Sequence, residues 1–353
     1  IWTQSFNGTP RYVSANGARE IIGELAIAAP LYAPQLQALA KLAHDASALA
    51  QSQLQLTQLQ VGTQIVDAWF QLALAQNQQA LWQQSLARNQ LLYSQVQQAF
   101  HAGATARLNL VQTRLLLTQA QNQYAQAQSA VRSARRALNL ELALPLSAPT
   151  RISRGTKALT NRSLSLPTIW QHALQSQPLL RIAEQQIRQG QTQISVQRAA
   201  TDPTVTANLA YGVDTATTPQ ENDLGWQAGI NLQLPLFGFG RNQDRIAAAK
   251  AHLTALRDAK NALLLQIHRQ INTDWGLYRQ AVVAHQHSAR AAKEARQVYE
   301  MTLHGFHAGA FTALTLSQAQ TSWIQAALTA TNARVQEQLA ATQLLLDEGR
   351  LPQ

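Results

Sequence analysis

Titratable and nucleophilic side chains are scattered along this chain and form no recognisable catalytic group. The 353 residues include 9 histidines and 18 acidic residues but no cysteine, which excludes disulfides and thiolate metal sites. No spacing of histidine and carboxylate residues matches a metal-ligand pattern, and the sequence contains neither a nucleophile elbow nor a phosphate-binding loop. We therefore expect no enzymatic activity, no bound metal and no cofactor.

One arrangement that includes a titratable side chain does occur twice. His101 lies in the stretch Phe-His-Ala-Gly-Ala at 100–104, and the same five residues recur at 306–310 with His307 as the counterpart. Because histidine titrates near neutral pH, the two side chains could form a pH-responsive site. The interpretation that we favour is simpler, namely two polar turn residues retained from a duplication.

The repeat extends well beyond the histidines. Residues on both sides are matched at the same offset of 206 positions, and the pairs are Ile65 and Ile271, Trp69 and Trp275, Leu108 and Leu314, Leu110 and Leu316, and Gln112 and Gln318. A second signature, Pro30-Leu31-Tyr32, is answered by Pro235-Leu236-Phe237 at an offset of 205. Two unrelated signatures that keep one offset to within a residue indicate an internal duplication. We place the first repeat at 1–155 and the second at 156–353.

The composition favours long helices with polar but uncharged faces. Charged residues are only 13% of the chain, against about 25% in soluble domains, and glutamine and alanine fill much of the difference. The net charge of +10 raises nucleic acid as a partner. The basic residues are scattered, however, and no zinc-finger, homeodomain or RNA-binding signature appears, so we expect no nucleic-acid binding.

Long helices are the elements that must position the repeated residues. No proline occurs from Gln35 to Leu144, and apolar residues recur there at helical spacing. The first helix should extend from about residue 33 to 98, on the order of 100 Å. Gly103 and Gly309 mark sharp reversals, because glycine adopts positive φ without a steric penalty. The predicted helical segments are 33–144, 167–200 with an interruption at Pro178, and 239–347.

Two strand pairs are predicted, at 1–32 and 203–237. In the second pair, apolar residues such as Leu209 and Ile230 alternate with small or polar ones over about ten residues, which is the pattern of a transmembrane β-barrel strand. The alternative is a soluble hairpin with one buried face. No run of 18 apolar residues occurs, so no transmembrane helix is predicted.

The order of these elements, with both signatures in place, resembles the TolC-like outer-membrane efflux protein family over essentially the whole chain. The family's strand-to-helix junction is similar to Leu-Pro-Leu-Phe-Gly-Phe-Gly-Arg at 234–241. Its helix-turn-helix element is similar to Phe-His-Ala-Gly at 100–103 with Leu-Asn-Leu at 108–110, and to 306–309 with Leu-Thr-Leu at 314–316. Both motifs are duplicated in order at one offset, which makes the resemblance specific.

The resemblance implies a mostly α-helical fold with two β-strand pairs, in which a strand-strand-long helix-reversal-helix unit is duplicated. Three subunits would form one transmembrane β-barrel in the outer membrane, and their helices would continue as a coiled-coil tube into the periplasm. If the strands are transmembrane, closure by copies is physically required, because an open sheet would leave backbone groups unpaired in lipid. The implied function is a passive exit duct of a tripartite efflux pump or a type I secretion system. The implied partners are two further copies, a periplasmic adaptor protein, an inner-membrane pump and outer-membrane lipid.

The resemblance also implies roles for particular residues. The expected helix-tip contacts with the adaptor are Phe100, Gly103, Leu108, Leu110, Phe306, Gly309, Leu314 and Leu316. The expected entrance-lining residues are Asn109, Gln112, Thr315 and Gln318. Asn109 and Thr315 stand where the family motif has aspartate, so we do not expect the acidic ring that closes some members. The expected membrane-interface residues are Tyr32, Tyr211, Trp226 and Phe237, and core aromatics are the alternative.

Family members carry two further helical stretches before the first strand pair. This chain opens on Ile1 without an initiator methionine, so we expect it to be N-terminally truncated relative to them. Two other functions are considered, a periplasmic helical-hairpin adaptor and a cytosolic coiled-coil scaffold. The adaptor lacks support because no lipoyl-like β module with glycine-rich turns is visible. The scaffold is disfavoured by the alternating strands and the sparse charge.

Overall fold

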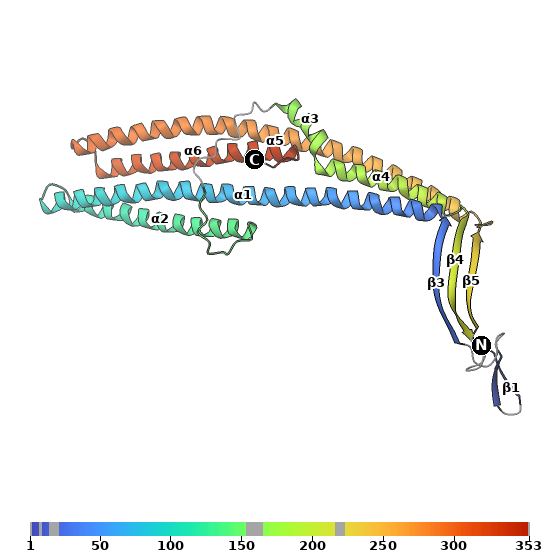
Figure 1. Ribbon diagram of the computed structural model, residues 1–353. Helices are drawn as coiled ribbons and strands as arrows, with labels where there is room; N and C mark the ends of the chain where they lie inside the picture. Colours follow the sequence, from blue (N-terminus) through green and yellow to red (C-terminus); the bar gives the residue numbers. More distant parts are fainter. Residues whose placement is uncertain (1, 7–8, 14–20, 153–164, 216–222, 352–353) are drawn as a thin grey trace. The chain divides into compact units, whose positions relative to one another are not determined.

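The fold consists of very long helices and a small number of strands (Figure 1). The computed structural model describes residues 2–6, 9–13, 21–152, 165–215 and 223–351. In chain order the elements are β1 (Trp2–Phe6), β2 (Thr9–Val13), β3 (Ile21–Tyr32), α1 (Pro34–His101), α2 (Arg107–Glu141), α3 (Leu166–Ser176), α4 (Pro178–Ala199), β4 (Thr204–Thr215), β5 (Asp223–Gln233), α5 (Arg241–His307) and α6 (Ala313–Asp347). The predicted helices, the interruption at Pro178 and both reversals are confirmed. α1 has 68 residues, which corresponds to about 100 Å.

Two compact units are formed, and each takes segments from both halves of the sequence. The strand unit comprises Ile1–Gln51 and Ile182–Lys260, and the hairpin unit comprises Ser52–Arg181 and Asn261–Gln353. The two sequence repeats at 1–155 and 156–353 are therefore not separate compact bodies. The repeat boundary stays a prediction about sequence organisation.

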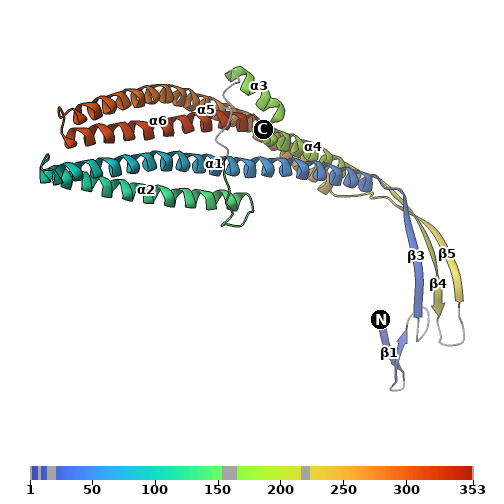
Figure 2. The ribbon, with the colours of Figure 1, turned by 60° about the vertical axis from the view of Figure 1, so that its left-hand side comes forward.

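The strand unit contains an antiparallel three-stranded sheet of order β3-β4-β5 (Figure 2). The register places Leu25 opposite Tyr211 and Tyr211 opposite Trp226. Because successive side chains point to opposite faces, one face carries Leu25, Ile27, Leu209, Tyr211, Trp226, Ile230 and Leu232. The other face carries Ala26, Ala28, Asn208, Gln227 and Asn231. The predicted alternation is confirmed, and most of the large side chains on the apolar face are more than half exposed in the single subunit.

The strands in 1–32 differ from the expected single pair. There are three of them, because β1 and β2 form their own two-stranded sheet while β3 pairs with β4. The physical reason is register, since the alternating run from Leu25 to Tyr32 matches the alternation of β4 on the same face. Among the described residues, β3 and β5 each pair with β4 alone, so the sheet of one subunit has two open edges and forms no closed barrel.

The hairpin unit contains two antiparallel helix pairs, α1 with α2 and α5 with α6, which lie side by side in both views (Figures 1 and 2). Leu72 of α1 packs with Val131 and Leu138 of α2 in one cluster. A second cluster joins α3, α4, α5 and α6 through Ile169, Leu180, Ile271 and Leu344. A third cluster, near the reversals, joins the two hairpins and is described below.

Candidate functional site

The two reversals have the same backbone geometry. Gly103 and Gly309 have φ of 71° and 77°, so both occupy the left-handed region predicted from the sequence. At the first reversal the Ala104 N–H donates to the Ala99 carbonyl at 2.8 Å and the Gly103 N–H donates to the Phe100 carbonyl at 3.0 Å. The second reversal has the same two hydrogen bonds at the same distances, and the backbone N–H groups of Ala310 and Gly309 are the donors. This pair of bonds is the Schellman motif, which satisfies the last carbonyls of a helix.

The two reversals differ in the side-chain hydrogen bonds at the start of the helix that follows each one, α2 and α6. In the second reversal the Thr312 hydroxyl caps α6 and accepts from the Thr315 N–H at 3.2 Å. In the first, Ala106 has the capping position and offers no hydroxyl, while the Asn109 amide donates to the Thr105 hydroxyl at 2.9 Å. Asn109 and Thr315, both expected to line an entrance, thus have local structural roles.

The expected adaptor contacts separate into exposed and buried groups. Leu108 and Leu314 are exposed at 65% and 49%, whereas Leu316 is buried at 1%. Gly103 and Gly309 lie at the exposed tips, and Phe100, Leu110 and Phe306 are partly buried. Of the expected entrance residues, Gln318 and Thr315 are exposed, while Gln112 and Asn109 are half-buried. Leu316 therefore supports the tips from the core and presents no contact surface.

The buried cluster behind the tips holds the two hairpins together. It contains Leu92 and Val96 of α1, Tyr299 of α5, and Leu316, Ala319, Trp323 and Ile324 of α6. The rings of Tyr299 and Trp323 stack with centroids 5.2 Å apart. The Arg88 guanidinium of α1 lies 4.2 Å from the centroid of Trp323 and 5.4 Å from that of Tyr299. Such cation–π contacts stabilise a partly desolvated arginine, so Arg88 links the hairpins.

Arg88 has no carboxylate partner in this cluster. Its Nη1 is buried without a hydrogen-bond acceptor, and Glu300, which lines the adjoining pocket, accepts from Arg296 Nε at 2.8 Å. Burial raises the pKa of Tyr299, and the charge of Arg88 opposes that rise. The guanidinium is thus a positive charge that the described residues do not neutralise.

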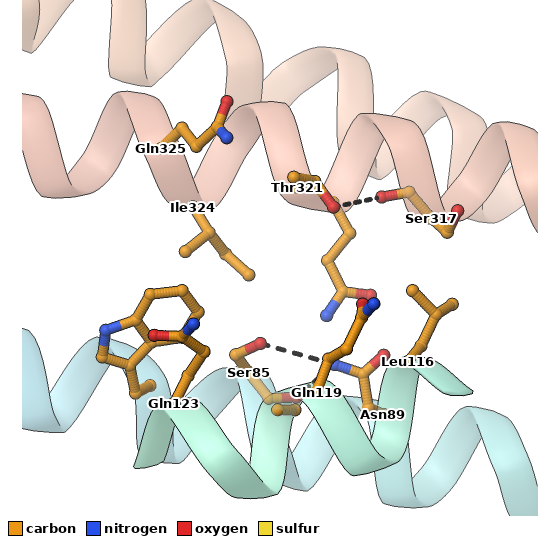
Figure 3. A pocket seen from close by; sticks show the side chains of 12 residues that line it. Ser85, Asn89, Leu116, Gln119, Gln123, Ser317, Thr321, Ile324 and Gln325 are labelled. Carbon is orange, nitrogen blue, oxygen red and sulfur yellow. Dashed lines mark hydrogen bonds between the residues drawn. The ribbon is translucent and has the colours of Figure 1, made fainter. Parts of the chain in front are cut away.

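A polar pocket of about 370 Å³ lies between α1, α2 and α6 (Figure 3). Figure 3 shows Ile324 of α6 pointing into the gap towards Ser85 of α1 and Gln119 of α2. The Asn89 amide donates to the Ser85 carbonyl at 2.9 Å, and the Thr321 hydroxyl donates to the Ser317 carbonyl at 2.9 Å. No charged side chain lines it; the lining is amides, hydroxyls and a few apolar groups. The lining thus offers hydrogen-bonding groups without a formal charge.

The structure also brings together two buried carboxyls that the sequence did not indicate, Asp274 of α5 and Asp347 at the end of α6. Burial raises the pKa of Asp347 to about 7, and its hydrogen bond and charge repulsion with Asp274 add to the rise. Asp347 Oδ2 is buried with no donor among the described residues. Burial beside a second carboxyl therefore keeps the Asp347 side chain protonated to a higher pH than an ordinary aspartate.

The expected membrane-interface residues belong to the strand unit. Tyr211 and Trp226 are neighbours on β4 and β5 with ring centroids 4.5 Å apart. Tyr32 ends β3, and Phe237 follows β5 with 86% of its surface exposed. Phe239, two residues later, is fully exposed with φ of 46°. These aromatic side chains are exposed to different degrees in the single subunit, and their place at a membrane interface stays a prediction.

The described part of the chain contains no cluster of three or more metal-ligating side chains. None of its helices combines the length and hydropathy needed to cross a membrane. Neither histidine of the reversals contacts a carboxylate; His101 and His307 are exposed and lie edge-on to Phe100 and Phe306.

Comparisons with known proteins point in one direction. A family profile described as outer membrane efflux protein matches residues 169–346, whereas no curated protein matches the sequence. The structure of the Campylobacter jejuni CmeC outer membrane channel is similar with a TM-score of 0.78 and 16% identity, over 97% of this chain and 73% of that one.

Two further channel structures have the same likeness at the same 16% identity. The Neisseria gonorrhoeae MtrE outer membrane channel, in its open state, has a TM-score of 0.75 over 94% of this chain and 80% of its own. The Vibrio cholerae outer membrane protein VceC has a TM-score of 0.72 over 94% and 87%. These likenesses establish that the fold is shared.

Proposed function

The chain belongs to the outer membrane efflux protein family, and on that premise we propose that it is a passive outer-membrane exit duct for small molecules. It works as a trimer whose helices extend into the periplasm. The duct performs no chemistry, and transport is driven by an inner-membrane pump reached through a periplasmic adaptor. Such an assembly needs a membrane-spanning part and a periplasmic docking part.

The observation that carries this proposal is the two-faced sheet of the strand unit. Its apolar face is exposed in the single subunit, with Leu25 and Ile230 each 74% exposed, and its opposite face is polar or small. A soluble hairpin would bury the apolar face, whereas a barrel strand turns it to lipid. The two open edges cannot remain unpaired in hydrocarbon, so they pair with the sheets of other copies.

The docking part is assigned to the two helix tips. Apart from its chain neighbours, nothing in the described structure lies within 4 Å of a Cβ built at Gly103 or Gly309. Leu108 and Leu314 are exposed beside them, and the buried Leu316 and Trp323 hold the tips rigid from behind. Small exposed tips on a rigid support suit contact with another helical protein. A periplasmic adaptor is the partner that we propose.

Cell fractionation tests the proposal against its two alternatives. We expect the full-length protein in outer-membrane extracts, as a trimer that dissociates when heated in detergent. A periplasmic adaptor would be released with the periplasmic or inner-membrane fraction, and a cytosolic scaffold would remain in the cytosol. Either of those distributions would contradict the exit duct.

A further inference from the structure

The first hairpin has a long segment without acidic residues, which extends from the middle of α1 over the tip to the end of α2. Between Asp67 and Glu141 the chain has no aspartate or glutamate, and it carries six arginines: Arg88, Arg107, Arg114, Arg132, Arg135 and Arg136. In the second hairpin the stretch between Glu300 and Glu337 is also free of acidic residues and carries Arg334, His304 and His307. In a chain that is already basic, the excess of positive charge is concentrated in these segments.

The described residues do not neutralise these six arginines. None of the six takes part in a salt bridge in the described structure. Arg107, Arg114, Arg132 and Arg136 are exposed, and Arg132 donates to the uncharged Ser129 hydroxyl at 2.8 Å. Arg88 Nη1 and Arg135 Nε are buried without acceptors.

The facing helix adds little negative charge. From 275 to 300, α5 carries Arg279, Arg290, Lys293 and Arg296 against two acids, Glu294 and Glu300. Glu300 is bound by Arg296 of the same helix. The hairpin that packs on the arginine-rich segment is thus itself net positive there.

These charges act on whatever passes between the helices. A helix with its side chains is only about 10–12 Å across, and the Debye length is about 8 Å at physiological ionic strength. At physiological ionic strength an exposed charge on one face of a helix is therefore largely screened at the other face, and its field reaches across the helix mainly in dilute salt. Uncompensated arginines along a pore favour anions and repel cations.

We propose that the tip side of the duct selects for anions, so that anionic solutes pass in preference to cationic ones. This inference rests on the exit-duct function proposed above and adds the charge class of its substrates. The selectivity arises from Arg107 and Arg114 on the exposed surface of α2, with Arg88 contributing from the helix interface. Phe-His-Ala-Gly-Ala at each tip adds no opposing charge.

The test is the reversal potential of the purified full-length trimer in planar lipid bilayers under a potassium chloride gradient. We expect chloride to be severalfold more permeant than potassium, and the preference to increase as the salt is diluted. A preference for potassium, or equal permeability in dilute salt, would overturn the proposal. Correctly trimeric protein that conducts no ions at all would instead contradict the exit duct itself.

A matched pair of double variants locates the selectivity. Arg107→Gln with Arg114→Gln removes two exposed charges from the hairpin unit, and Arg198→Gln with Arg257→Gln removes two exposed charges from the strand unit. Unheated gels would check that both variants form trimers. The first variant should still form a conducting trimer but lose most of the chloride preference, and the second variant should retain that preference. Equal losses in the two variants would show that the tips do not set selectivity.

Discussion

Asp347 is a carboxyl group whose protonation is coupled to folding. It lies 9% exposed beside Asp274, and the end of α6 cannot move away because the Gln177 amide donates to the Asp347 carbonyl at 3.0 Å. His172 contacts the adjacent Glu348 at 3.1 Å, and Gln343 donates to Asp347 itself at 3.3 Å. Among the described residues, no cation forms a salt bridge with Asp274 or Asp347.

The raised pKa of Asp347 predicts a decline in stability with rising pH. A carboxyl that binds its proton more tightly when folded stabilises the protein fully below its unfolded pKa of 3.8, and loses that contribution as the pH rises through about 7. Each pKa unit corresponds to about 1.4 kcal/mol. Asp347→Asn mimics the protonated, neutral side chain at every pH. This variant should therefore weaken the dependence of the melting temperature on pH between about 4 and 8. At the alkaline end of that range its melting temperature should be higher than that of the parent protein.

The exposed Asp258, also on α5, is the control for this variant. Asp258→Asn removes the same charge and should leave the pH dependence as in the parent protein. If Asp347→Asn and Asp258→Asn give the same melting curve at every pH, the raised pKa of Asp347 does not affect stability. The measurement needs only detergent-solubilised protein and is independent of transport.

Gly309 tests the docking role of the tips. A side chain there meets open space within the subunit, but φ of 77° strains any residue with a Cβ by about 1–2 kcal/mol. Asparagine tolerates this conformation better than most residues, so Gly309→Asn separates strain from bulk. We expect Gly309→Trp to abolish drug resistance while heat-sensitive trimers persist, and Gly309→Asn to retain resistance. If Gly309→Trp kept wild-type resistance, the tip would not be part of the adaptor interface.

Three helices end at a glycine with positive φ, and the surroundings of these glycines differ. Gly103, Gly309 and Gly349 all end helices with positive φ, yet only Gly349 is enclosed. A Cβ at Gly349 would lie 2.7 Å from the Ser176 carbonyl and 2.9 Å from Pro178 Cδ. The end of α6 thus packs closely on the break between α3 and α4, where the backbone cannot move aside.

This enclosure predicts unequal costs for the same substitution. Gly103→Ala should cost only the conformational strain, about 1 kcal/mol, because its Cβ is unobstructed. Gly349→Ala adds a backbone collision to that strain and should destabilise the protein by about 3 kcal/mol or more. Denaturant unfolding of both variants checks the difference. Equal shifts would mean that the contact of Gly349 with the α3–α4 break is not tight in solution.

For the assembled protein, the faces of β5 decide which side meets lipid. Ile230 is on the apolar face and Asn231 on the polar face of the same strand, and both are exposed in the single subunit. A lysine facing lipid costs about 2–4 kcal/mol near the bilayer centre, whereas lumenal positions tolerate charge. Ile230→Lys should therefore reduce the heat-sensitive trimer in outer-membrane extracts, and Asn231→Lys should leave it unchanged. Reversed results would invert the assigned faces.

The sequence by itself determined the features that depend on local physics. Helical spacing and the absence of proline predicted the lengths of α1 and α5, and glycine at 103 and 309 predicted positive φ, because these properties are set within a few residues of the chain. Alternation predicted the two faces of β4 and β5 for the same reason. The duplicated motifs identified the family that the profile match supports.

Contacts between distant segments were decided only by the tertiary structure. Nothing in the local pattern shows that β3 pairs with β4, that Leu316 is buried, or that Arg88 stacks on Trp323. Asp274 and Asp347 are 73 positions apart, and the pKa of Asp347 is raised because the α5–α6 hairpin buries that carboxyl beside Asp274. Packing energies depend on which helix surfaces meet. A periodic sequence of alanine, leucine and glutamine allows many helix pairings of similar strength, and only the tertiary structure shows which pairing forms.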